Sequence, residues 1–244
     1  ILEEILKHNH NISSYNFYLD ISKLLADIEQ QELKNSCNYN SHINYNLFGS
    51  ITGRLTTRKH SFPILTLAKK SRNIIGSVND FLLELDFNAV EPRVYLGLIK
   101  QNQPEVDIHT WHQELYEKTF NENISRNQIK EKFFSWFYGY KNEPFGIEEI
   151  DKIYNKNKII DNYWNNGIVT TLYEKQFETL KEKSFNNIIQ STAALMFLEQ
   201  AVQIHKFLKQ NNSKSFIKFL IHDSLVIDFS KEEKLLYRKL IEIF

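Results

Sequence analysis

The apolar residues of this chain recur mostly at helical spacing. Near the start they predict helix over residues 1–35, and the recurring positions are Ile5, Ile21, Leu24, Leu25 and Ile28. The same spacing predicts three further helices, in "EVDIHTWHQELYEKTF" (105–120), "SRNQIKEKFFSWFYGY" (125–140) and "SFNNIIQSTAALMFLEQAVQIHKFLKQ" (184–210). Residues 142–180 are polar and aromatic, and we interpret them as irregularly helical.

Strand patterns stand on both sides of these helices. "LFGSITGRLTTRKHSF" (47–62) predicts a strand and a turn, and the apolar run "DFLLELDF" (80–87) predicts a strand buried on both faces. "SKSFIKFLIHDSLVIDF" (213–229) predicts two short strands around a turn. The order of helix, strands, helices and strands indicates an α+β fold with a helical insertion between sheet segments.

Two acids interrupt the most strand-like segments. Asp86 ends the first apolar run, and Asp223 lies at the centre of "FLIHDSLVIDF" (219–229). One such acid is more often structural, capping a helix or pairing with an arginine. Two carboxylates in the central strands repel each other unless a cation lies between them, and Mg²⁺ is the natural cation for hard oxygen ligands.

The segment 125–140 carries a second pattern. Arg126, Lys130, Phe134 and Tyr138 are spaced by four, which on a helix makes one stripe from two cations to two aromatic rings. An ordinary amphipathic helix explains this spacing. A nucleotide-binding surface explains it too, because cations hold phosphates and aromatic rings pack on bases and sugars.

The composition excludes only a few classes of protein. The 244 residues carry a formal net charge of zero, which disfavours a protein that is basic all over but allows a local basic groove. A single cysteine excludes a disulfide framework and a thiolate metal cluster. The apolar runs are far shorter than the ~18 residues of a membrane span, and no secretion signal is visible, so we expect no membrane partner and an intracellular location.

Five motifs together resemble the family A DNA polymerases, the DNA polymerase I type. They are "TGRL" (52–55), "DFNAVEPR" (86–93), "RNQIKEKFFSWFYG" (126–139), "NNIIQSTAA" (186–194) and "IHDS" (221–224). Each is weak alone, but five in the family's order are specific. The resemblance begins near residue 45 and continues to residue 244.

The resemblance implies a polymerase palm with a small antiparallel sheet, interrupted by a helical fingers subdomain, with the thumb absent or reduced. It places the N-terminal helices and first part of the palm in residues 1–105. The fingers fall in residues 106–182 and the second part of the palm in residues 183–244. The implied partners are primer–template DNA and dNTPs, and a phage is one possible source.

The resemblance also implies a two-metal nucleotidyl transfer. Asp86, Asp223 and the backbone carbonyl of Phe87 would bind two Mg²⁺ ions, for which Mn²⁺ could substitute. Arg126 and Lys130 would hold the triphosphate, and Lys130 is also a candidate acid for the leaving group.

Further roles follow from the same resemblance. Phe134 would pack on the sugar, while Glu91 and Tyr138 would crowd the 2′ position and so favour deoxyribose. The implied DNA contacts are Arg54, Asn186, Gln190 and His222.

The chain departs from the family at several positions. Ser224 stands where the second carboxylate motif normally ends in Glu, Ser135 replaces a Gly, and Glu182 lies where an arginine is expected. An alternative function is therefore a catalytically weakened module that binds nucleic acid or a protein partner. A metal-dependent nuclease would also use the acid pair, but it leaves the stripe on the fingers helix unexplained.

Overall fold

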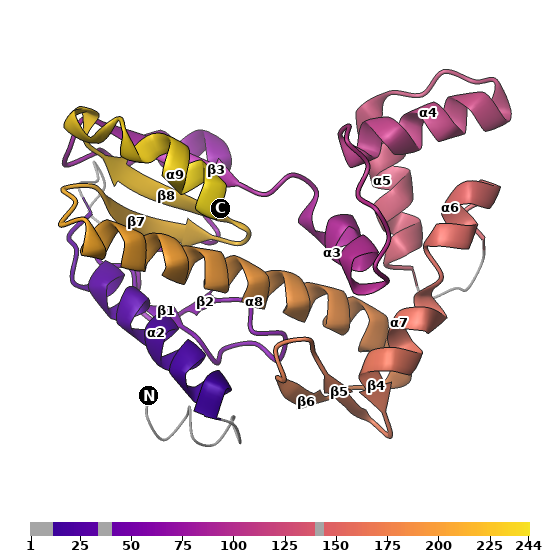
Figure 1. Cartoon of the computed structure of the whole chain (residues 1–244), viewed down its shortest axis with the longest axis horizontal. Coiled ribbons are helices and arrows are strands. Elements are labelled where there is room, and N and C mark those ends of the chain that lie inside the picture. The colour runs from indigo at the N-terminus through magenta and orange to yellow at the C-terminus, as the bar shows by residue number, and fades with distance from the viewer. Residues whose placement is uncertain (1–11, 34–40, 140–143) are drawn as a thin grey trace. The chain divides into compact units, whose positions relative to one another are not determined.

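The computed structural model describes residues 12–33, 41–139 and 144–244. The chain divides into two compact units, one formed by Ile1–Phe87 with Ala194–Phe244 and the other by Asn88–Ala193. Figure 1 labels the elements of both units. Of the helical segment expected over residues 1–35, residues 1–11 and 34–35 lie outside the described residues, as does the cysteine at position 37.

The first unit is built on a three-stranded antiparallel sheet in the order β3-β8-β7 (Figure 1). Its strands are β3 (Phe81–Asp86), β7 (Phe216–Ile221) and β8 (Ser224–Phe229). Every residue of β8 is buried, because this strand lies between two neighbours and is covered on both faces. The predicted pair of short strands around a turn is therefore confirmed. β3 confirms the strand predicted at 80–87, but the expectation that it is buried on both faces was wrong, because β3 is an edge strand in which only Leu85 is buried.

Several smaller elements complete the first unit. Helix α2 (Ile12–Glu29) precedes β1 (Tyr45–Asn46) and β2 (Thr56–Thr57), which pair antiparallel. Two 3₁₀ turns, η1 (Lys69–Ile74) and η2 (Lys231–Glu233), and helix α9 (Leu236–Ile243) follow. The buried Tyr45 hydroxyl donates to Leu220 O at 2.6 Å and accepts from Leu220 N at 2.9 Å, which joins β1 to β7.

Helix α8 (Lys181–Gln210) is the longest element in the described part of the chain. Ala193 ends the second unit and Ala194 resumes the first, so both units include part of this helix. Its residues from Ile188 to Ile204 are mostly buried, which explains why apolar positions recur so densely in this segment.

The second unit is mainly helical. Its helices besides the start of α8 are α3 (Val90–Leu98), α4 (Ile108–Phe120), α5 (Arg126–Phe137), α6 (Glu148–Ile153) and α7 (Lys156–Tyr163). Helices α4 and α5 confirm the two helices predicted from the spacing of apolar residues. Ser125 is the N-cap of α5 and forms a capping box with Gln128.

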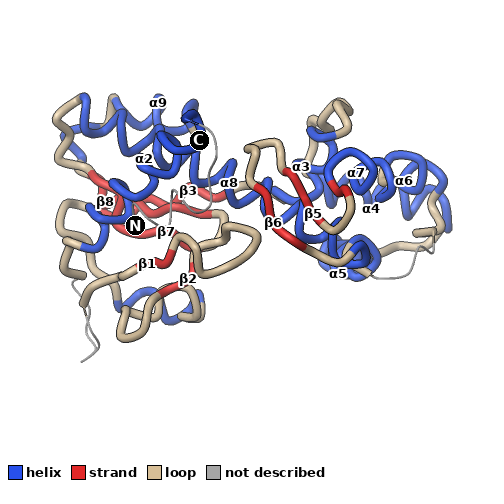
Figure 2. Tube along the Cα trace, turned by 90° about the horizontal axis from the view of Figure 1, so that it is seen from below, coloured by secondary structure: helices blue, strands red, loops and turns tan. Residues whose placement is uncertain are grey.

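A small sheet in the second unit was missed by sequence reasoning. Strands β4 (Trp164–Asn165), β5 (Ile168–Thr170) and β6 (Gln176–Glu178) pair antiparallel, and Figure 2 shows these short strands in red. Segments of two or three residues are too short to give a periodic pattern. The signal that could have found them is Asn166-Gly167, because both residues have positive φ, as a two-residue hairpin turn requires.

The α+β class predicted from the order of helices and strands is confirmed. None of the helices in the described residues is long and apolar enough to cross a membrane.

Candidate functional site

The two predicted catalytic acids lie at one end of the sheet of the first unit. Asp86 is the last residue of β3 and pairs with Ser224, the first residue of β8. Asp223 directly precedes Ser224, and Phe87 N donates to Asp223 O at 3.5 Å. The sheet register therefore brings Asp86, Phe87 and Asp223 to neighbouring positions.

Asp223 is not a strand residue and is not fully buried. It lies in the two-residue turn between β7 and β8, and its side chain is half-buried. The other turn residue, His222, is exposed and has φ 51°, in the left-handed region that few non-glycine residues adopt. Asp223 therefore lies in the turn of the two predicted strands and not within a strand, because β7 ends at Ile221 and β8 begins at Ser224.

Ser224, where the family pattern has Glu, contacts another acid of the same sheet. Its Oγ lies 3.3 Å from Glu84 Oε1 and 3.2 Å from Ile221 O, and its single proton can be donated to either acceptor. Glu84 and Asp86 are two residues apart on β3, so their side chains lie on one face of the sheet with Ser224. A carboxylate from β3 thus lies beside the position that the family fills from the second motif.

The deeply buried acid of this sheet is Asp228, which sequence reasoning missed. It accepts hydrogen bonds from Lys218 Nζ at 2.7 Å, Val78 N at 2.7 Å and Asn79 N at 2.8 Å. The Lys218 and Asp228 side chains are 1% and 0% exposed. The sequence signal was an opposite pair of charges in two adjacent apolar segments of one hairpin, and a bulge between Ile217 and Phe219 lies at the lysine.

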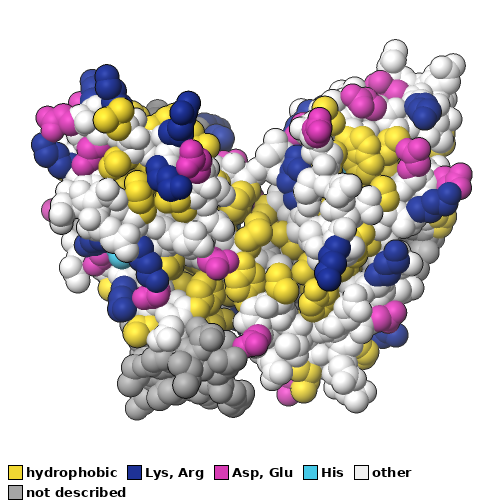
Figure 3. Space-filling view, viewed as in Figure 1, with side chains coloured by type: hydrophobic (Ala, Val, Ile, Leu, Met, Phe, Trp, Pro, Cys, Tyr) yellow, Lys and Arg dark blue, Asp and Glu magenta, His cyan; other side chains and the backbone are white. Residues whose placement is uncertain are grey.

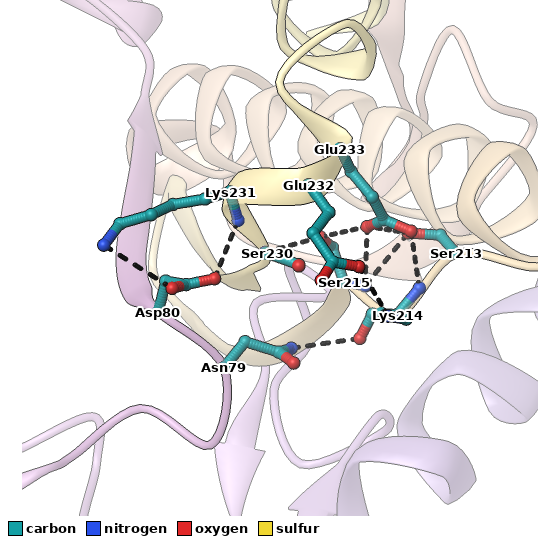
Figure 4. Close-up of polar contacts among 9 residues, drawn as sticks. All are labelled: Asn79, Asp80, Ser213, Lys214, Ser215, Ser230, Lys231, Glu232 and Glu233. Carbon is teal, nitrogen blue, oxygen red and sulfur yellow. Dashed lines mark hydrogen bonds and ion pairs between the residues drawn. The ribbon is translucent and has the colours of Figure 1, made fainter.

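Beyond Asp228, the open end of the hairpin is fixed by Glu233 (Figure 4). This carboxylate accepts hydrogen bonds from Ser213 Oγ at 2.7 Å, Lys214 N at 2.7 Å and Ser215 N at 2.9 Å. Partial burial opposes ionisation, but hydrogen bonds from Ser215 and Ser213 lower the pKa of Glu233 to about 2. The acids at this end therefore serve the structure of the hairpin.

In the second unit, α5 presents the predicted stripe. Ile129, Phe133 and Phe137 are buried, whereas Arg126 and Lys130, in the first half of the helix, are exposed. The rings of Phe134 and Tyr138 are stacked, with centroids 6.0 Å apart and an interplanar angle of 14°. Tyr138 is the C-cap of the helix and not an interior residue.

Neighbouring elements hold both ends of α5. At the start, Arg126 donates to Asp107 through Nε at 2.9 Å and through a terminal nitrogen at 2.8 Å. At the end, Lys156 Nζ donates to Trp136 O at 2.8 Å and Gly139 O at 3.0 Å. A cation at the last carbonyls stabilises a helix C-terminus, so Lys156 fixes the point at which α5 ends.

Two buried histidines lie under α5 and were not predicted. His109 is 5.4 Å from the Phe134 ring, and His112 stacks on Phe133 with centroids 4.2 Å apart. Burial, and next the charge of Lys130, lower the pKa of His109 to about 4. Burial lowers the pKa of His112 to about 3, so both rings are neutral near pH 7.

The remaining predicted residues lie on other elements of the two units. Asn186 and Gln190 are on α8, and Asn186 Nδ2 donates to Tyr138 O at 3.3 Å, which brings it to the end of α5. Glu91 is in the first turn of α3. Arg54 is exposed in the loop before β2, where its carbonyl accepts from Ser50 Oγ at 3.0 Å.

The charges around these residues are mixed. On the face drawn in Figure 3, Lys and Arg side chains alternate with Asp and Glu on each unit. Within the described ranges, no group of three or more His, Cys, Asp or Glu side chains could hold a metal ion. Any cation between Asp86 and Asp223 would therefore rely on few protein ligands.

The fold is similar to that of a solved polymerase domain. The structure is similar to that of the POL domain of Pol1 from M. smegmatis, solved in complex with DNA primer-template and dNTP, with a TM-score of 0.63 and 13% sequence identity. That match covers 94% of this chain and 47% of the other chain.

The sequence is also similar to that of a DNA polymerase. The chain is 23% identical to DNA polymerase I of Caldicellulosiruptor bescii, over 99% of this chain but only 34% of that protein. The chain thus spans about a third of the length of the curated relative it matches. No protein-family model matches the chain. The predicted resemblance to the DNA polymerase I type of family A is confirmed in sequence and in fold.

Proposed function

We propose that this chain is the core of a template-directed DNA polymerase, which adds deoxynucleotides to a primer 3′-hydroxyl. The observation that carries the proposal is the register of β3 with β8, which places Asp86 beside the turn that holds Asp223. Residues 106–182 would supply the fingers. Residues 1–105 and 183–244 would supply the palm and the N-terminal helices.

The donor set at this end of the sheet fits magnesium. Mg²⁺ is usually held by one or two carboxylates, with waters and substrate phosphates completing its ligands, so Asp86 and Asp223 suffice without a third acid. The carbonyl of Phe87 is a further hard oxygen, and Mn²⁺ accepts the same donors. When bound, the metal supplies a lower pKa for the primer hydroxyl and neutralises charge on the phosphates.

The chain's own residues would bind and orient the nucleotide. Arg126 and Lys130 would hold the triphosphate, and Lys130 would be the source of a proton for the leaving group. Phe134 would pack on the sugar. Glu91 and Tyr138 would favour deoxyribose. The hydrogen bond from Lys156 to Gly139 O at the end of α5 would keep Tyr138 in place.

The DNA partner would be a primer–template. Arg54 and Gln190 would contact hydrogen-bond acceptors in the minor groove. These acceptors look alike for every correct base pair, so the contacts would check the shape of the base pair and not its sequence. His222, in the turn beside Asp223, would contact the primer end, and Asn186 would support Tyr138.

Primer extension tests the proposal directly. The full chain, with a primer–template, dNTPs and Mg²⁺, should extend the primer. Asp86→Ala and Asp223→Ala should each reduce extension by about a thousandfold or more, a loss typical of removing a residue at the reacting centre. Asp161 is an exposed acid of α7, so Asp161→Ala is the matched control and should extend the primer normally.

The second candidate is a weakened polymerase-like module, and Ser224 in place of the family's Glu favours it. Such a module would bind a primer–template or a dNTP without extending the primer. Retained binding together with absent extension in the unaltered chain would replace the first proposal by this one.

A further inference from the structure

Arg126, the proposed triphosphate ligand, is already held by a carboxylate. Asp107 accepts two hydrogen bonds from its guanidinium, at 2.9 and 2.8 Å, in the bidentate arrangement that phosphates and carboxylates share. The Arg126 side chain is 43% exposed and that of Asp107 is 22% exposed. An anion can therefore reach the guanidinium from solvent.

Asp107 also has a structural task that does not need its charge. It is the N-cap of α4, where its side chain accepts from His109 N at 3.1 Å and Thr110 N at 2.9 Å. Asparagine and serine cap helices about as well as aspartate does. The cap and the ion pair can thus be separated by substitution.

We propose that Asp107 competes with the triphosphate for Arg126, so that nucleotide binding exchanges one anion for another at this guanidinium. The identity of the ligand rests on the proposed function, but the competition itself does not. Lys130, one turn further along α5, keeps its ammonium exposed and would make the first contact. Asp107 then determines how strongly the phosphates must bind before Arg126 exchanges its hydrogen bonds to Asp107 for hydrogen bonds to the phosphates.

Competition by Asp107 predicts the direction in which anion affinity changes when the Asp107 charge is removed. If Asp107 competes, removing its charge strengthens anion binding, because the guanidinium no longer exchanges partners and a nearby negative charge disappears. If Asp107 instead aligns Arg126 for the phosphates, removing its charge weakens binding. An exposed ion pair is worth little, so the expected gain in affinity is about two- to fivefold.

Asp107→Asn is the main variant, and Asp107→Ser is a second neutral cap if the first does not fold. Glu114→Gln is the matched control, because Glu114 is an exposed acid of α4. Calorimetry with inorganic tripolyphosphate, without DNA, measures the anion site alone, and dTTP is the second probe. The neutral Asp107 variants should bind both probes about two- to fivefold more tightly, and Glu114→Gln by much less.

A double variant shows whether the effect passes through Arg126. In the Arg126→Ala background, Asp107→Asn should tighten tripolyphosphate binding by much less than it does in the unaltered chain, because only the loss of a nearby negative charge remains. Unchanged or weaker binding by the neutral Asp107 variants overturns the inference, as does an absence of tripolyphosphate binding in both the unaltered chain and the variants. Tighter binding without any primer extension by the unaltered chain leaves the inference standing and rejects the proposed function.

Discussion

The two ends of the β7–β8 hairpin use acids in opposite ways. At the open end, Asp228 and Glu233 accept several hydrogen bonds each, and Asp228 is fully buried with Lys218. At the turn end, Asp86 is exposed and Asp223 is half-buried.

The difference between the ends separates acids that fix the packing of the hairpin from acids that remain accessible. A buried carboxylate needs paired charge and hydrogen bonds to be tolerated, so Asp228 contributes to one fixed packing of the hairpin. An accessible carboxylate at the end of a rigid strand can accept an outside ligand. The open end therefore fixes the strands, and the turn end presents the acids.

The largest expected effect is at the open end. Lys218→Met leaves the Asp228 charge buried without its cation, and breaking a buried pair in this way costs about 3–5 kcal/mol of stability. Urea unfolding followed by circular dichroism measures the change. Asp223→Asn is the contrasting variant at the turn end and should change the free energy of unfolding by about 0.5 kcal/mol or less.

The double variant Lys218→Met with Asp228→Asn checks the cause. The introduced asparagine would carry no charge, and its one side-chain oxygen would still accept from one of the two backbone amides, Val78 N or Asn79 N, which donate to different oxygens of Asp228. We expect the double variant to recover much of the lost stability. If the double variant is no more stable than Lys218→Met, loss of packing explains the effect and the buried charge does not.

Sequence reasoning found most of the large elements because their patterns are long. Helix α5 shows its buried residues in their spacing, and β3 is a run of apolar residues broken only by Glu84 before it ends at Asp86. The strands β4 to β6 were missed because two or three residues carry no periodicity.

The site was predicted less completely than the fold. The acids Asp86 and Asp223 were identified through motifs, but their environments were not, since burial depends on which residues the sheet pairs. The partnerships of Lys218 with Asp228 and of Arg126 with Asp107 join residues on different elements. Only the sheet register and the packing of helices determine such contacts.

An intermediate effect is expected at the turn end, where Ser224 lies beside Glu84. Restoring the family's residue by Ser224→Glu brings a second carboxylate to a buried position next to the Glu84 carboxylate. Like charges in cross-strand positions repel, and we expect a loss of about 1–3 kcal/mol in the free energy of unfolding. Thermal and urea unfolding measure it.

Exchanging the two residues is the matched control for this prediction. Glu84→Ser with Ser224→Glu keeps one acid and one hydroxyl in the same diagonal contact between β3 and β8, while position 224 still lies directly opposite Asp86. The exchange should recover part of the lost stability. An exchange variant as unstable as Ser224→Glu would show that repulsion from Glu84 does not set the cost.

The smallest expected effect concerns His222, the turn residue with φ 51°. Glycine adopts this conformation without strain, so His222→Gly should raise the free energy of unfolding by about 1 kcal/mol or less. Ala89→Gly, also at φ 51°, is the matched control for strain relief. If His222 contacts the primer end, only His222→Gly should also reduce primer extension. A gain in stability with unchanged extension would remove His222 from the site, and the turn would then serve only to hold Asp223 beside Asp86.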